Sequence, residues 1–251
     1  MFVMLIIGGD RLGFQNIFKR YELKYLITEE QYSKLRQLMS EYMKGDEYGR
    51  STICNLYYDT PDYLLIRRSI EKPVFKEKLR VRSYGVADEN STTFIELKRK
   101  YDKVVYKRRI ASTDSKSYDF LVKREKICEG QIAKEINYFL DFYKSLEPRV
   151  FLSYEREAFY GIDNHDFRMT FDRNILWRDY DLSLCKGIYG NNILKENTVL
   201  MEIKVAAAIP MWLVKFLSEN KIYKTSFSKY GNAYKTIMSD KISGGLCYAE
   251  R

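Results

Sequence analysis

Basic side chains recur at alternate positions in this sequence, a spacing that could gather them around a phosphate-rich ligand. The clearest case is the row formed by Lys76, Lys78, Arg80 and Arg82. Successive side chains of a β-strand point to opposite faces, so an alternating segment has one ionic face and one apolar face. Arg binds phosphate through two parallel N–H bonds, and Lys acts as a mobile point charge. The pattern therefore indicates a binding site for a highly charged anion.

The same alternation occurs in six segments, and most of the charges in it are positive. The segments are residues 20–25, 76–82, 94–100, 104–109, 167–172 and 198–205. An ordinary half-solvated sheet also alternates, but its solvent face mixes the two signs more evenly and uses more Thr, Ser and Gln. An inside-out barrel explains the set better, because its apolar faces pack outward against helices and its basic faces line a channel. Such a channel would repel itself unless a polyanion filled it.

The elements that must position these side chains are mostly strands. Segments rich in Tyr, Phe, Val and Ile predict eight strands, at about 18–27, 51–59, 74–84, 92–99, 103–111, 149–160, 166–173 and 198–206. Helices are predicted near 28–44, 115–145, 207–219 and 228–239, with a short helix after Thr60-Pro61. Most strands follow one another without an intervening helix. The expected fold is therefore α+β, an eight-stranded antiparallel β-barrel with flanking helices.

The composition agrees with an anionic ligand and argues against several other kinds of site. The chain has 251 residues, with 43 Lys and Arg, 34 Asp and Glu, and a formal net charge of +9. His165 is the one histidine, and the four cysteines form no CxxC pair, so neither a His-metal cluster nor a zinc or disulfide framework is expected. No P-loop motif occurs. The basic residues alternate along strands rather than lining an exposed helix, so no nucleic acid is expected as a partner.

Seven short motifs occur in this order along the chain: Arg20-Tyr-Glu22-Leu-Lys24-Tyr, Leu56-Tyr-Tyr-Asp59-Thr, Lys78-Leu-Arg80-Val-Arg82, Phe94-Ile-Glu96-Leu-Lys98, Tyr154-Glu-Arg156, Met201-Glu202-Ile-Lys204 and Ser226-Phe-Ser228-Lys229-Tyr230. Taken together, they resemble the VTC domain, the polyphosphate polymerase branch of the triphosphate tunnel metalloenzymes. The resemblance implies a tunnel that holds a triphosphate and a divalent metal, and transfer of the γ-phosphate of ATP to a growing polyphosphate chain. We expect residues 1–17 to be an N-terminal extension, 18–240 the tunnel domain and 241–251 a C-terminal tail.

Two departures narrow the resemblance. Triphosphatase and adenylyl cyclase members usually begin with Glu-x-Glu-x-Lys, whereas this sequence has Arg20-x-Glu22-x-Lys24. The missing carboxylate points away from hydrolysis or cyclisation and toward the polymerase branch. The sequence also shows neither the SPX domain nor the membrane segment of eukaryotic VTC polymerase subunits. It therefore resembles the stand-alone bacterial form, and a cytoplasmic protein without a membrane span is expected.

The resemblance implies that nine cations contact the phosphates. The catalytic set is Lys24, Arg80, Arg82, Lys98 and Lys204, and the set that holds the phosphate chain is Lys107, Arg156, Arg168 and Lys229. Phosphoryl transfer mainly requires alignment of the attacking and leaving oxygens and compensation of their charge, which converging cations supply. No general base is expected, because a terminal phosphate oxygen is already anionic.

The resemblance also implies a divalent metal, Mn²⁺ or Mg²⁺. Glu202 matches the metal-bridging Glu of the family, and one or two carboxylates plus phosphate oxygens are usual ligands for these ions. Glu22 and Glu96 are further candidates, with pairing to neighbouring Lys and Arg as their alternative role. Asp172 either orients Arg168, assists the nucleophile or is structural.

The sequence leaves more than one function open. The preferred function is a polyphosphate polymerase, whose partners are ATP, pyrophosphate and polyphosphate. The alternatives are a module that binds polyphosphate or a nucleotide without turnover, and a tunnel triphosphatase. Glu202 favours catalysis, because a pure anion binder needs no metal site. The sequence does not identify a regulatory partner protein.

Overall fold

The computed structural model describes residues 21–102 and 104–248, with the backbone alone for 244–248. All eight predicted strands are confirmed in this part of the chain: β1 (Tyr21–Thr28), β3 (Ser51–Asp59), β4 (Phe75–Tyr84), β5 (Thr92–Tyr101), β6 (Val104–Thr113), β7 (Glu147–Gly161), β8 (Arg168–Arg178) and β10 (Thr198–Val205). Three short strands have no counterpart in the prediction: β2 (Met43–Gly45), β9 (Asn191–Asn192) and β11 (Lys224–Thr225). The predicted extension at 1–17, and Arg20, lie outside the described residues.

The strands form one antiparallel sheet that curls without closing through backbone hydrogen bonds. Its order is β11-β1-β10-β8-β7-β3-β4-β5-β6, with β2 paired to β7 and β9 paired to β8. The predicted closed barrel is therefore only an approximation. Side chains bring the two ends of the sheet together instead. Lys98 Nζ on β5 lies 3.9 Å from Glu22 Oε2 on β1, and Lys78 Nζ on β4 donates to Ser228 Oγ, close to the end of β11, at 3.2 Å.

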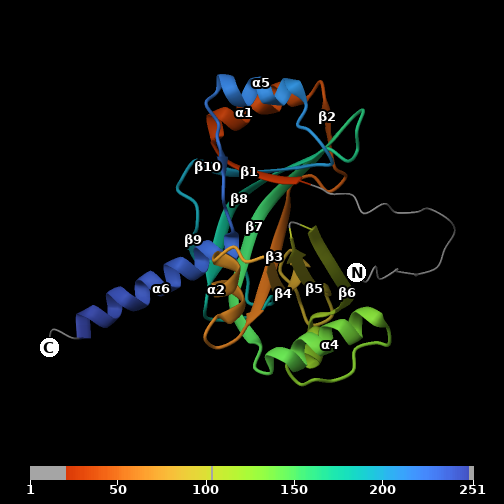
Figure 1. Ribbon diagram of the computed structural model, residues 1–251, viewed down its shortest axis with the longest axis vertical. Helices are drawn as coiled ribbons and strands as arrows, with labels where there is room; N and C mark the ends of the chain where they lie inside the picture. The colour runs from red at the N-terminus through yellow and green to blue at the C-terminus, as the bar shows by residue number, and fades with distance from the viewer. Residues whose placement is uncertain (1–20, 103, 249–251) are drawn as a thin grey trace.

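Two helices cover the outer face of the sheet where β1, β8 and β10 lie, at the top of Figure 1. These are α1 (Glu29–Met39) and α5 (Met211–Glu219). α1 begins at the predicted position with a capping box whose N-cap is Thr28. The two helices and the sheet enclose a buried cluster that contains Met39 and Phe171.

A second pair of helices covers the outer face of β3, β4, β5 and β6, and one of them, α4 (Gln131–Tyr143), lies at the bottom of Figure 1. The single helix predicted for 115–145 is wrong, because the chain forms α3 (Asp114–Leu121) and α4. The helix is interrupted where Arg124 and Gly130 have φ angles of 64° and 144°, values that an α-helix does not accept. Residues from α3 and α4 pack with Leu79 of β4 in one buried cluster.

The remaining two helices pack on the inner face, which the prediction assigned wholly to charges. They are α2 (Leu64–Ile70) and α6 (Lys229–Tyr248). Leu152 shares the inner face with Arg82, since both lie opposite Asn55, and Leu152 belongs to a buried cluster with Ile237 of α6. The expectation that apolar faces only pack outward is therefore wrong for this part of the sheet. α6 needs an apolar partner for its own buried side chains.

α6 continues past its predicted end at residue 239 and extends away from the sheet (Figure 1). A buried carboxylate, Asp59 at the end of β3, fixes the start of α2 and the start of α6 together. It accepts hydrogen bonds from the backbone N–H groups of Leu65 and Ile66 and from the Tyr230 hydroxyl at 2.9 Å. None of the helices in the described part of the chain combines the length and apolar composition that a membrane crossing requires.

Candidate phosphate-binding channel

The strand register places the predicted site residues on the inner face of the curled sheet. Directly opposed pairs on this face are Arg80 with Glu96, Lys98 with Lys107, Arg82 with Asn55, Lys24 with Glu202, Glu22 with Lys204, Lys204 with Arg168, and Arg156 with Asp172. Lys229 reaches the same face from the first residue of α6. We call the space that these side chains enclose the channel. The alternation in the sequence therefore predicted the facing correctly.

One wall of the channel is organised around Glu96, which is only 1% exposed. Its carboxylate oxygens lie 2.7 Å from Arg80 Nη2, 3.8 Å from Arg82 Nε, 2.6 Å from Lys107 Nζ and 3.4 Å from Arg109 Nε. Burial disfavours the charged form of Glu96, but Arg80 and Arg82 outweigh burial and lower its pKa to about 2. At neutral pH one negative charge therefore faces four positive charges on this wall.

The facing wall contains two buried carboxylates that share cations. Arg156 donates to both oxygens of Asp172, at 2.6 and 2.7 Å. Lys229 Nζ lies 2.5 Å from Asp172 Oδ2 and 3.1 Å from Glu202 Oε1, and Lys24 Nζ lies 3.3 Å from Glu202 Oε1. Burial opposes ionisation of both carboxyls, yet Lys229 holds the pKa of each below its usual range, with help from Arg156 and, at Glu202, Lys24.

Glu22 connects the two walls at the seam where the sheet fails to close. Its Oε1 lies 3.2 Å from Lys24 Nζ on its own strand, and its Oε2 lies 3.9 Å from Lys98 Nζ on β5. Burial raises the pKa of Glu22, but Lys98 and Lys24 outweigh burial, and the pKa is lower than usual. Burial lowers the pKa of Lys204, which lies opposite Glu22.

Two predicted residues do not match their expected surroundings. Arg168 is exposed and lies opposite Lys204, without joining either carboxylate cluster. Asp172 does not orient Arg168, because its carboxylate is taken by Arg156 and Lys229. The strand register explains why Asp172 pairs with Arg156. A bulge between Ser153 and Glu155 shifts the register of β7 relative to β8, and this places Arg156 directly opposite Asp172.

Among the residues that face the channel without belonging to the predicted set, Lys78 and Tyr57 have the most strongly shifted pKa values. Lys78 lies between Lys76 and Arg80 on the inner face, and burial lowers its pKa to about 8. The Tyr57 hydroxyl accepts a hydrogen bond from Arg80 Nη1 at 3.1 Å. Burial would raise the pKa of Tyr57, but Arg80 and Lys78 lower it to about 8. The alternating row 76–82 already signalled Lys78, whereas no sequence pattern singled out Tyr57.

The carboxylates of the channel can be tested as ligands for the divalent metal that the family implies. Among the residues that the structure describes, no three His, Cys, Asp or Glu side chains form a metal-binding group. Glu22 and Glu202 both contact the Lys24 ammonium, at 3.2 and 3.3 Å, so two carboxylates lie close together beside a cation. Two carboxylates fit Mg²⁺ or Mn²⁺ when phosphate oxygens and water supply the remaining ligands.

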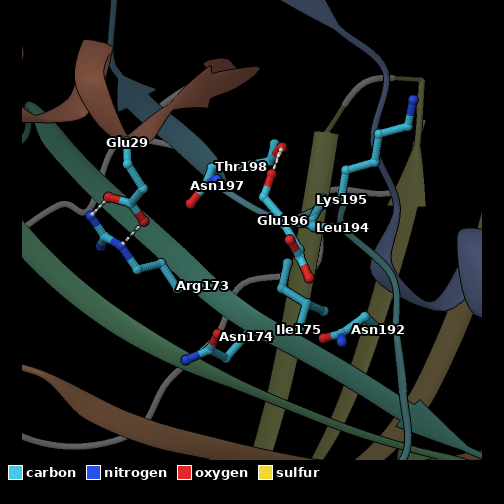
Figure 2. A pocket seen from close by; sticks show the side chains of 10 residues that line it. All are labelled: Glu29, Arg173, Asn174, Ile175, Asn192, Leu194, Lys195, Glu196, Asn197 and Thr198. Carbon is cyan, nitrogen blue, oxygen red and sulfur yellow. Dashed lines mark hydrogen bonds and ion pairs between the residues drawn. The ribbon is translucent and has the colours of Figure 1, made fainter.

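A separate hollow of about 310 Å³ lies beside residues 192–198, outside the channel. Figure 2 shows that Glu29 and Arg173 face each other at its wall through two hydrogen bonds, of 2.7 and 3.0 Å. Arg173 also donates to Glu157 at 2.9 Å. None of the predicted site residues lines this hollow, and its one buried cation is already neutralised. The hollow therefore offers an anion one further cation, the exposed Lys195.

The sequence of this chain matches one known protein family. The VTC domain family matches residues 19–238. The chain belongs to this family. No curated protein matches the sequence. Among solved structures, a candidate adenylate cyclase from Bacillus halodurans is 14% identical, covers 82% of this chain and 92% of its own, and has a TM-score of 0.52. The likeness shows that this VTC chain shares the fold of that structure.

A structure from Hippeastrum has a lower TM-score, 0.46. It describes a candidate adenylyl cyclase with a dominant triphosphatase activity. It is 15% identical and covers 83% of this VTC chain and 92% of its own.

Proposed function

We propose that this VTC domain is a polyphosphate polymerase, which transfers the γ-phosphate of ATP to the end of a polyphosphate chain inside the channel. The observation that carries the proposal is the convergence of Lys and Arg from both walls on one enclosed space. On the Glu96 wall, four cations surround one carboxylate. Such an excess of positive charge is unfavourable in the free protein and becomes favourable when a polyanion enters.

The reaction needs positioning and charge compensation more than acid–base chemistry. A terminal phosphate oxygen of the acceptor chain attacks the γ-phosphorus of ATP, and the bond between that phosphorus and the β–γ bridging oxygen breaks. ADP leaves with the electron pair, and the acceptor grows by one phosphate. Arg80, Arg82 and Lys98 on one wall and Lys24, Arg156 and Lys229 on the other hold the phosphate oxygens in line. The attacking oxygen is already anionic, so no general base is assigned.

The carboxylates take two different roles in this proposal. Glu202, with Glu22, holds the divalent metal, which supplies charge neutralisation for the transferred phosphate when it is bound. Glu96 keeps Arg80, Arg82 and Lys107 extended into the channel as their counter-ion, because all three reach its carboxylate. Lys204 and Arg168 lie side by side in the register and extend the basic surface toward one opening.

The test is incubation of the purified protein with ATP and Mn²⁺, with and without a pyrophosphate primer. Long-chain polyphosphate is then resolved on a gel, and ADP is measured in the same sample. The wild type should make polymer and ADP in equal phosphate equivalents. Glu202→Ala should make neither, whereas Glu196→Ala, which removes an exposed carboxylate outside the channel, should behave as the wild type.

Other outcomes identify the alternatives. Free phosphate without polymer would assign the protein as a triphosphatase. Tight binding of polyphosphate with no turnover would assign a binding module. Polymerase is preferred over triphosphatase because Arg20 replaces the first carboxylate of the Glu-x-Glu-x-Lys pattern.

A further inference from the structure

Four lysines on β4 and β5 form two like-charged pairs on the channel face. In the antiparallel register, Lys76 lies directly opposite Lys100, and Lys78 lies directly opposite Lys98. Like charges at directly opposed positions of neighbouring strands are destabilising. We call Lys76, Lys78, Lys98 and Lys100 the lysine strip. It continues the row of Arg80 and Arg82 along the same face of β4.

Carboxylates neutralise the lysine strip poorly, in contrast to the cations around Glu96, Asp172 and Glu202. Within the described residues, Lys76, Lys78 and Lys100 make no ion pair with a carboxylate, and Lys98 has one partner, Glu22, at 3.9 Å. Lys76 donates instead to the backbone oxygen of Ser69 at 3.4 Å, and Lys78 to Ser228 Oγ. These oxygens are neutral, so they leave the charge of the lysines uncompensated.

The surroundings of the lysine strip disfavour its positive charge. Burial lowers the pKa of Lys76, and Lys100, Lys98 and Lys72 lower it further. Burial likewise lowers the pKa of Lys78, and Lys98 and Lys76 add to the effect. Tyr57 opposes the shift at Lys78, whereas an anion that binds from outside the described chain would relieve the repulsion along the whole strip. The lysine strip therefore has the properties of a binding site rather than of a structural salt-bridge network.

We infer that the lysine strip binds the phosphates of a linear polyphosphate chain that lie beyond those held between the two carboxylate clusters. The inference rests on the proposed function, and it adds a second anion subsite that distinguishes a long chain from a triphosphate. Along β4, the row from Lys76 to Arg82 extends about 20 Å at roughly 3.3 Å per residue. Three linked phosphates are too short to contact this whole row, whereas a longer chain can.

The test compares the binding of tripolyphosphate and long-chain polyphosphate to the wild type and to the double variant Lys76→Gln/Lys100→Gln. Neither substituted residue belongs to the proposed catalytic set, so affinity for tripolyphosphate should stay the same. Affinity for the long chain should fall by roughly tenfold, as expected when two charge-assisted contacts are lost. The salt dependence of long-chain binding should also become shallower, by roughly one to two in the slope of log K against log salt.

A matched double variant, Lys116→Gln/Lys235→Gln, removes the same net charge at two exposed lysines outside the channel. It should leave the binding of both ligands unchanged. The thermal midpoint of the ligand-free protein should rise in the lysine-strip variant, since like-charge repulsion is relieved, and should stay constant in the control.

The contrary results separate failure of the lysine strip from failure of the proposed function. If the wild type binds tripolyphosphate but gains no affinity from a longer chain, the lysine strip is not a subsite. The same conclusion follows if the lysine-strip variant loses affinity for both ligands equally. If the wild type binds neither ligand, the proposed function fails and the inference fails with it.

Discussion

Lys229 Nζ, at the first residue of the C-terminal helix, lies 2.5 Å from Asp172 Oδ2 in the middle of strand β8. The same ammonium lies 3.1 Å from Glu202 Oε1. A residue distant in sequence therefore completes the charged wall that the strands begin. The channel is assembled only when α6 has docked on the inner face of the sheet.

Asp172→Asn should destabilise the protein strongly. The side chain is fully buried, and the substitution leaves Arg156 and Lys229 without their shared carboxylate. Breaking a buried ion pair on one side costs about 3–5 kcal/mol of unfolding free energy. Urea unfolding measures this loss. Asp141→Asn, which removes an exposed carboxylate that pairs with Arg124, should change the urea midpoint very little.

Removal of the Glu202 charge should abolish the effect of metal on ligand binding. In the wild type, Mn²⁺ should tighten the binding of tripolyphosphate, because in the proposed function Glu202 and Glu22 hold the ion beside the phosphates. Glu202→Gln should bind tripolyphosphate at least as tightly as the wild type without metal, since a negative charge is gone, and should gain nothing from Mn²⁺. Titration calorimetry with and without Mn²⁺ measures both effects. Retention of the Mn²⁺ effect would rule out Glu202 as a ligand.

Affinity for tripolyphosphate should fall as the pH rises from about 7 to about 9. The pKa of Lys78 and that of Tyr57 are both lowered to about 8. Above this pH Lys78 loses its positive charge and Tyr57 gains a negative charge, and both changes oppose anion binding. Lys98, Lys24 and Lys76 lower the pKa of Lys78 against an opposing effect of Tyr57. Arg80, Lys78 and Arg82 lower the pKa of Tyr57.

The stability of the ligand-free protein should change in the opposite direction. The folded-state pKa of Lys78 lies below its ordinary value of 10.5, so between the two values the unfolded chain holds more protons. Stability therefore rises with pH in this range. Lys78→Arg keeps its charge throughout and should flatten both pH dependences. Equal pH dependences in the wild type and Lys78→Arg would contradict the assignment to Lys78.

Arg178→Met should destabilise the protein without changing phosphate affinity. The Arg178 guanidinium is buried and donates to the backbone oxygens of Asp181, Ser183, Gly187 and Tyr189. Loss of these bonds leaves buried carbonyl groups unsatisfied, at a total cost of about 3 kcal/mol or more. Thermal unfolding and tripolyphosphate binding, measured below the transition, separate the two effects. Arg67→Met, at an exposed arginine, is the control and should be nearly neutral.

The sequence predicted the strands and the facing of their side chains well, because alternation is a local property. The row from Lys76 to Arg82 and the segment with Glu96 and Lys98 each show the period of two that a strand imposes. Family resemblance added Lys229, which alternation alone would not place in the channel. The structure brings all of these side chains to one face.

The sequence did not predict the contacts that depend on the register between strands distant in the chain. The partner of Asp172 is set by the bulge between Ser153 and Glu155, which no local pattern encodes. Tyr230 stacks on Tyr57 with ring centroids 4.6 Å apart, so part of the inner face is apolar, although the strands there were expected to be purely ionic inside. Closure of the sheet was also mispredicted, because alternation specifies the faces of a strand but not which strands pair at the edges.

The open seam between the two edge strands of the sheet, β6 and β11, changes how a polymer can reach the channel. A barrel joined all the way round by backbone hydrogen bonds would have to be threaded from a free end. Here, within the described residues, the seam is bridged by side chains, such as Lys98 and Glu22 at 3.9 Å. These side-chain contacts can separate without breaking any backbone hydrogen bond between strands. The middle of a polyphosphate chain can therefore enter the channel through the seam. A polyphosphate whose two ends are blocked by bulky groups should then bind as readily as one whose ends are free.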